Sequence, residues 1–319
     1  MKWLLFAALS APLTLSCVAM GCASETLTTS KRDAGTSKKD TGTEEEEEEI
    51  DPIPVRDSGV NPGQDSGPKS GRVYAHTAKV LYLFEPYSNE MKKIGNFGCL
   101  TAQEEMFDLA VDQSGGLFGT VYDRDTANTT SDWSFVEINL ITAGCTKIVQ
   151  GTEAYPNSLT FVPSGTLDPS REALVGYNGN SYMRIDTTTG KPTVIGTLNT
   201  PDAGETYLPA GDLVSIIGDK TYITLKNNAG TKQFLGEVDP KTGRLIKLIG
   251  ETNTPDLFGV GYWGGVVYGF KADGAYFSID SKTGAATKVG QLDGSDAGGG
   301  TQGLGFYGAG SSTSAPTAK

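Results

Sequence analysis

The stretch FLGEVDPKTGRLIKLIG, residues 234–250, reads as two short strands joined by a tight turn at residues 239–243. The leading Asp239 can accept hydrogen bonds from backbone amides two or three residues on, and Gly243 supplies the left-handed residue that closes a hairpin. The pattern returns around residues 186–190 and 280–284, and weaker copies centre on residues 139–144 and 85–89. We therefore interpret these aspartates as turn formers rather than catalytic or calcium-binding groups.

A second pattern lies between the hairpins: a short apolar strand, a turn marked by glycine, and another strand. It pairs residues 107–111 with 116–122, 159–162 with 173–177, 213–217 with 220–225, and 260–263 with 266–270. Each pair followed by its hairpin makes a four-stranded unit. At the C-terminus, residues 303–307 match only the first strand of a unit, whereas residues 72–95 supply only the last three. Joined, they would complete a fifth unit.

This repeat predicts an all-β fold, a five-bladed β-propeller with four strands per blade. Pairing of the N- and C-terminal strands would close the ring and remove the exposed edges of an open array. The repeat resembles those of secreted bacterial β-propellers of the NHL and YVTN type, in which an Asp-x-x-Thr-Gly hairpin alternates with a Gly-Leu-x-Phe strand, as at residues 239–243 and 303–306. The resemblance covers about residues 72–308 and implies the fold rather than a function.

Residues 1–22 have the features of a secretory signal: Lys2, then an apolar run, ending at Cys22. The sequence Ala19-Met20-Gly21-Cys22 resembles the lipobox of bacterial lipoproteins, although Ala19 replaces the usual leucine; ordinary cleavage after a small residue is the alternative. We expect Cys22 to be acylated and to anchor the chain to a lipid bilayer of the bacterial envelope, at the outer membrane. The sequence leaves open which side of that membrane the protein faces.

Residues 23–71 contain six consecutive glutamates, Glu44 to Glu49, and almost no apolar clusters, so we expect a disordered acidic linker. Residues 309–319 are expected to form a flexible tail. The chain has a formal net charge of −12, which argues against a nucleic-acid partner because such a partner requires a basic face.

After signal removal two cysteines remain, Cys99 and Cys145, and an exported chain with one pair usually oxidises them to a disulfide. Two buried thiols are the alternative. The single histidine, His76, equips the chain poorly for zinc, haem or a histidine-based triad, and a lone histidine is most often packed or exposed. We predict no cofactor and identify no metal ligands.

A ligand site is expected where the first strand of each blade begins, at one mouth of the central channel. The aligned positions there are Asp108, Ser158, Asp212, Gly259 and Gly303, preceded by Phe107, Asn157, Gly211, Phe258 and Gln302. Asp108 and Asp212 should face each other, with Asn157, Gln302, Tyr155 and Tyr207 as further candidates. Acidic residues are frequent in the surrounding loops: Glu104, Glu105, Glu153, Asp202, Glu205, Asp256, Asp293 and Asp296.

This acidic mouth would suit a cation, a carbohydrate or a protein ligand, with tyrosines stacking on a sugar face; a solvated loop surface without a ligand is the plainer alternative. We therefore predict a binding or scaffolding module and assign no catalytic residue. The rival hypothesis is a carbohydrate-active or metal-dependent hydrolase that uses Asp108 and Asp212. Two inner carboxylates alone favour binding, whereas a third, such as Glu205, would favour catalysis.

Overall fold

A computed structural model describes residues 72–124, 133–151, 154–199, 206–292 and 305–318. The predicted signal (1–22), including Cys22, and the predicted linker (23–71) lie outside the described residues, as does Gln302. Within the described part, the chain forms five four-stranded antiparallel sheets arranged as a β-propeller, which confirms the predicted fold. The described ranges contain no helix long and apolar enough to cross a membrane.

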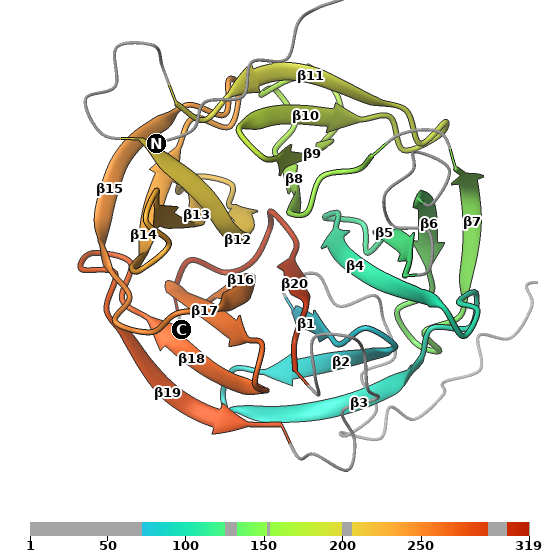
Figure 1. The fold of residues 1–319 in the computed structure, drawn as a ribbon, viewed down its shortest axis with the longest axis horizontal. Coiled ribbons are helices and arrows are strands. Elements are labelled where there is room, and N and C mark those ends of the chain that lie inside the picture. Colours follow the sequence, from blue (N-terminus) through green and yellow to red (C-terminus); the bar gives the residue numbers. More distant parts are fainter. Residues whose placement is uncertain (1–71, 125–132, 152–153, 200–205, 293–304, 319) are drawn as a thin grey trace, which may run out of the picture. The chain divides into compact units, whose positions relative to one another are not determined.

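Each blade runs from an inner strand beside the channel to an outer strand at the rim (Figure 1). Blades 1 and 2 comprise β4 (Glu104–Val111), β5 (Leu117–Asp123), β6 (Trp133–Ile138), β7 (Cys145–Gln150), β8 (Leu159–Val162), β9 (Ala173–Asn178), β10 (Ser181–Ile185) and β11 (Pro192–Thr197). Blades 3 and 4 comprise β12 (Tyr207–Ser215), β13 (Thr221–Asn227), β14 (Gln233–Val238), β15 (Leu245–Glu251), β16 (Leu257–Trp263), β17 (Val266–Lys271), β18 (Ala275–Ile279) and β19 (Ala286–Gln291). Blade 5 combines β20 (Gly308–Ser311) with β1 (Val73–His76), β2 (Val80–Glu85) and β3 (Glu90–Asn96).

Strand β20 closes the ring by pairing antiparallel with β1, as predicted, but it lies later in the chain than residues 303–307. Phe306 is fully buried and packs edge-on against Phe270, with ring centroids 5.4 Å apart, so it fills the junction between blades 4 and 5 rather than the inner strand. The closing strand is instead the small-residue run Gly308-Ala309-Gly310-Ser311. Small side chains suit the crowded centre, where the inner strands of several blades meet.

The segment after β20, predicted as a flexible tail from residue 309, packs against the end of the channel at which the inner strands finish. Ser312 and Thr313 are buried. The backbone amide of Ile217, after β12, donates to the carbonyl of Thr313, and that of Gly264, after β16, donates to the carbonyl of Pro316. The propeller therefore extends past residue 308, and residues 312–316 bridge blades 3 and 4 on the side away from the predicted mouth.

The core consists of buried apolar clusters at the junctions between neighbouring blades. One cluster joins blades 1 and 2 through Phe135 and Phe161, and another joins blades 4 and 5 through Phe84 and Phe270. Such aromatic residues bury large areas and supply much of the packing energy. The blades are thus held to one another mainly by side-chain packing, while hydrogen bonds hold the strands within each blade.

The repeated hairpins have the turn chemistry that the sequence predicted. The carboxylate of Asp186 accepts hydrogen bonds from the amides of Thr188 and Thr189, both at 2.9 Å, and Asp280 accepts equivalent bonds. Gly243 closes its turn with φ of 70°, and a Cβ there would lie 2.2 Å from the ring of Tyr182 in the preceding blade. Glycine is therefore required both by the turn and by the packing of blade 3 on blade 2.

Candidate functional site

A pocket of about 240 Å³ lies where the inner strands begin, at the predicted mouth. Four of the five residues that precede the aligned positions line this pocket: Phe107, Asn157, Gly211 and Phe258. The fifth, Gln302, lies outside the described residues, and Tyr307, just before β20, lines the pocket as well. The pocket is lined by Phe107, Tyr122, Asn157, Pro209, Ala210, Gly211, Lys226, Phe258 and Tyr307. Its residues come from all five blades, so its shape depends on closure of the ring.

The aromatic rings of the pocket are held in place by their neighbours. The ring of Phe107 packs edge-on against Tyr122 and Trp133, with centroids 5.1 and 4.9 Å away. The hydroxyl groups of Tyr122 (β5) and Tyr307 (before β20) both donate to Oε2 of Glu105, at 2.8 and 3.2 Å. These contacts fix ring positions before any ligand binds, which lowers the entropic cost of binding.

Glu105 is fully buried behind the two tyrosines, and its Oε1 lies 3.5 Å from the Nη1 of Arg124. The charge of this carboxylate is therefore balanced from within the protein. Lys226, on β13, is exposed at the pocket, and its ammonium forms no ion pair or hydrogen bond in the part of the chain that the structure describes. Lys226 is the one charged side chain among the described lining residues.

Asp108 and Asp212 come together beneath the pocket, each only 1% exposed. Asp212 Oδ1 accepts hydrogen bonds from the amides of Leu159 (3.1 Å) and Leu213 (3.0 Å), and Oδ2 accepts one from Ala309 (3.1 Å). Asp108 Oδ1 accepts from its neighbour Leu109 at 2.7 Å. The pair thus ties together β4, β8, β12 and β20, four of the five inner strands.

The two carboxyl groups lie within hydrogen-bonding reach of each other, so one proton between them removes the repulsion of two buried negative charges. Burial raises the pKa of Asp108 well above its usual range, and the adjacent Asp212 raises it further. Burial also raises the pKa of Asp212, to about 7, against the opposing effect of its hydrogen bonds. Burial thus favours the protonated form in both carboxyl groups.

His76, at the end of β1, completes this buried centre. Its Nε2 lies 3.8 Å from Asp108 Oδ1 and its Nδ1 lies 3.0 Å from the carbonyl of Thr77. Burial lowers the pKa of His76 to about 4, so the ring is neutral at physiological pH. A Cβ on Gly308 would lie 2.2 Å from Asp108 Oδ1 and 2.6 Å from His76 Nε2. The glycine at this ring position makes room for the aspartate and the histidine.

Of the other predicted site residues that the structure describes, one lines the pocket and two belong to the core. Asn157 is exposed in the pocket. Tyr155 is 2% exposed, and its hydroxyl donates to the carbonyl of Gly190 at 2.7 Å, within blade 2. Tyr207 is 7% exposed and packs edge-on against Phe234. The two tyrosines predicted to stack on a ligand are therefore core residues, whereas Tyr122 and Tyr307 line the pocket.

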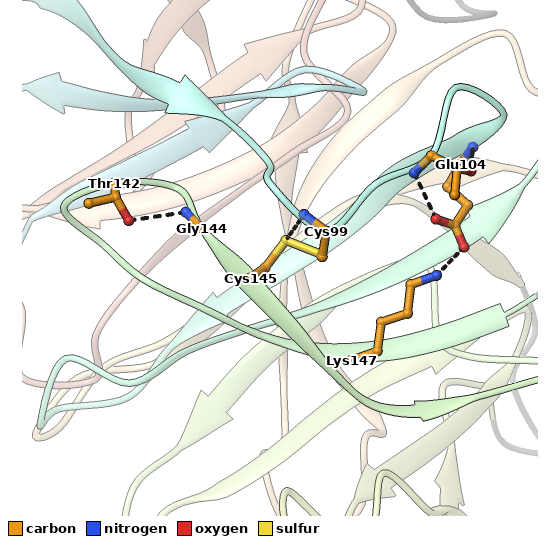
Figure 2. Close-up of a disulfide and its surroundings, with 7 residues drawn as sticks. Cys99, Glu104, Thr142, Gly144, Cys145 and Lys147 are labelled. Carbon is orange, nitrogen blue, oxygen red and sulfur yellow. Dashed lines mark hydrogen bonds and ion pairs between the residues drawn. A yellow bond between two sulfur atoms is a disulfide. The ribbon is translucent and has the colours of Figure 1, made fainter.

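The described part of the mouth is more aromatic than acidic. Glu104 is mostly buried, pairs with Lys147 and accepts from the amide of Thr101 at 3.0 Å (Figure 2). Asp256 is exposed before β16. The remaining acidic loop residues of the prediction, Glu153, Asp202, Glu205, Asp293 and Asp296, lie outside the described residues. No group of three or more His, Cys, Asp or Glu side chains in the described ranges could hold a metal ion.

Cys99 and Cys145 form a disulfide that joins the loop between β3 and β4 to the start of β7 (Figure 2). The amide of Gly98 also donates to the carbonyl of Ala143 at 3.1 Å, so this loop follows the outer edge of blade 1. At its other end the loop is held by Lys79, whose ammonium donates to the carbonyls of Thr101 and Ala102. The disulfide thus supports the segment that leads into β4 and the pocket.

No protein-family model matches this chain, and neither does any curated protein. Among solved structures, it is similar to an oligogalacturonate lyase in complex with manganese (14% identity, TM-score 0.37, 71% of this chain and 63% of the lyase). It is also similar to a calcium-binding regucalcin from Agrobacterium tumefaciens (16%, TM-score 0.36, 63% of this chain and 65% of that one). A third structure is an auxiliary nutrient binding protein from Bacteroides thetaiotaomicron (12%, TM-score 0.37, 73% of this chain and 56% of that one).

The chain thus spans under two thirds of the length of these three proteins. Similarities this distant assign neither a family nor a function.

Proposed function

We propose that this protein is a β-propeller binding module of the NHL and YVTN type, tethered to the bacterial envelope, that takes a small ligand in the pocket at the channel mouth. The single observation that carries the proposal is this pocket. It is concave, contains contributions from every blade, and is lined by four aromatic rings together with a few polar groups. That combination is typical of small-molecule sites.

The position of the carboxyl pair favours binding over the hydrolase alternative. A glycosidase needs one carboxyl group as acid and another as nucleophile or base, both within reach of the scissile bond. Asp108 and Asp212 are 1% exposed, lie against each other, and accept hydrogen bonds from inner-strand amides. Their arrangement is suited to holding the inner strands together beneath a ligand.

The tether in this proposal is an acylated Cys22 in the outer membrane, followed by the acidic stretch 23–71 as a spacer. A spacer of this composition would hold the propeller away from the lipid surface while leaving the mouth accessible. Metabolic labelling with an alkyne palmitate in a bacterial host tests the tether. Label in the wild-type chain and its loss in Cys22→Ser are expected, whereas an unlabelled wild-type chain released in soluble form would contradict the tether alone.

Binding at the mouth is tested by thermal unfolding of the full chain with calcium chloride, spermidine, and neutral and acidic sugars. A ligand at one hundred times its Kd should raise the midpoint by about 5 °C or more. Phe258→Ala, which removes one ring of the pocket, should abolish the shift. The matched control is Tyr87→Ala, which removes a 77% exposed ring from the hairpin between β2 and β3, on the other side of the propeller. A shift insensitive to Phe258→Ala would contradict the mouth as the site.

A further inference from the structure

The pocket at the mouth has a definite size and polarity. Its volume of about 240 Å³ is below the range of roughly 300–1,000 Å³ found for sites of drug-sized ligands. Space of this size accommodates a single ring with small substituents. Phe107, Phe258 and Tyr307 line it with aromatic rings, which suit either an aromatic ring or the apolar face of a pyranose.

The charged side chains around the pocket differ in whether other groups of the protein already balance them. Glu105 is engaged by two tyrosine hydroxyls and by Arg124. Asp108 and Asp212 are buried beneath the lining, where Asp212 accepts hydrogen bonds from three backbone amides and Asp108 Oδ1 accepts one. Among the described residues, this leaves the ammonium of Lys226 as the charge at the pocket that the protein does not balance.

From these two observations we infer that the ligand is a one-ring compound bearing a carboxylate, with its ring against the aromatic walls and its carboxylate paired with Lys226. Asn157, exposed in the same lining, adds a side-chain amide that can hydrogen-bond ring substituents. A cationic ligand would meet Lys226 and be repelled, although the aromatic rings alone would attract it. This inference rests on the proposed function, because it names the ligand class of the same pocket.

Two sources share this chemistry, a sugar acid and an aromatic acid, and matched pairs of probes separate them. Calorimetric titration of the full chain uses glucuronate against glucuronamide, and benzoate against benzamide, with benzylamine as the cationic probe. Within at least one pair the acid should bind about fivefold more tightly than its amide, the size expected for an exposed ion pair. The preferred pair identifies the source.

The Lys226→Gln variant should lower the affinity for the preferred acid about fivefold and leave the affinity for its amide unchanged. Added salt should reduce the preference in the wild-type chain. Lys232→Gln is the matched control. Lys232 lies in the same blade, directly before β14, but it pairs with Glu251 at 2.7 Å and does not line the pocket. The control should keep the full preference for the acid.

The outcomes distinguish failure of the ligand class from failure of the proposed function. The carboxylate inference would be overturned if acid and amide bound with equal affinity, or if benzylamine bound more tightly than the acids. If Phe258→Ala also abolished that binding, the mouth would remain the binding site. Binding that persists unchanged in Phe258→Ala, or no binding by any of the five probes together with no thermal shift from the wider panel, would overturn both.

Discussion

Aspartates occur in two regions of this propeller, in the hairpin turns and at the channel centre, and in both they accept hydrogen bonds from backbone amides. Asp186 and Asp280 are exposed, and the turn amides lower the pKa of both carboxyls. Asp108 and Asp212 are buried against each other, and burial raises the pKa of both. With the same kind of partner, the ionised form of aspartate is therefore favoured in the turns and the protonated form at the centre, because only the central pair is removed from water.

Removing the Asp212 carboxylate, which accepts hydrogen bonds at the channel centre, should lower the free energy of unfolding most. Asp212→Ala leaves the amides of Leu159, Leu213 and Ala309 without their acceptor in a buried place, and each buried donor without a partner costs about 1–3 kcal/mol. We expect the free energy of unfolding to fall by more than about 3 kcal/mol in chemical denaturation. Asp212→Asn, which keeps one acceptor oxygen, should lose less. Equal small losses in both variants would contradict the bridging role.

The buried pair should also make stability depend on pH. A carboxyl whose folded-state pKa is raised contributes stability that is present below its unfolded pKa, near 4, and is lost as pH rises through its folded pKa, about 7 for Asp212. His76, whose pKa burial lowers to about 4, contributes with the opposite sign, since its contribution is lost as pH falls toward 4. A variant that retains His76 is therefore needed to separate the contribution of the aspartates to the pH dependence of stability.

Asp108→Asn provides that comparison, because its amide can donate to Asp212 without a shared proton. Between about pH 5 and pH 7 the wild-type chain should lose stability relative to Asp108→Asn by about 1.4 kcal/mol per pH unit, the effect of one proton. Urea unfolding at a series of pH values measures this difference. Parallel stability curves for the two proteins would show that the pair holds no extra proton.

Substitution of a hairpin aspartate should lower the free energy of unfolding least, and the pH dependence of stability should have the opposite sign to that of the central pair. Asp186→Ala removes an exposed acceptor of two turn amides, and we expect a loss below about 1 kcal/mol because solvent screens the site. The pKa of Asp186 is lowered, chiefly by the hydrogen bond from the Thr189 amide, so its contribution is present above the unfolded pKa and is lost as pH falls. A loss that instead grows as pH rises from 5 to 8 would place Asp186 with the central pair.

The sequence predicted the parts of the fold that have local signals. The hairpins of blades 2, 3 and 4 each carry an aspartate and a left-handed glycine, whereas Ala143 and Asn89 take the left-handed position in blades 1 and 5. These local signals allowed the blades to be counted without knowing how they pack. The closing strand has no such signal: Gly308-Ala309-Gly310-Ser311 is set by the narrow space beside Asp108, whereas the more strand-like Phe306 fills a junction between blades. The prediction accordingly placed the last strand too early and did not name Tyr307, which lines the pocket.

The site was predictable where it follows from strand register. Phe107, Asn157, Gly211 and Phe258 line the pocket because each precedes the aligned position of its inner strand. Tyr122 and Lys226 lie on second strands and reach the pocket only through blade geometry, and the burial of Asp108 depends on a glycine contributed by the far end of the chain. No local pattern encodes these relationships, which explains why the sequence indicated an acidic mouth while the described lining is aromatic.

The most direct test compares, in one binding experiment, how much the Phe258 ring and the buried Asp108 carboxyl each contribute to ligand affinity. The full chain, Phe258→Ala and Asp108→Asn are titrated calorimetrically at pH 6 with glucuronate, glucuronamide, benzoate and benzamide. We expect Phe258→Ala to lose binding of whichever probe the wild-type chain takes, while Asp108→Asn binds it with unchanged affinity. Retained binding in Phe258→Ala together with loss in Asp108→Asn would contradict this expectation, since the ligand would then contact the carboxyl pair rather than the rings above it.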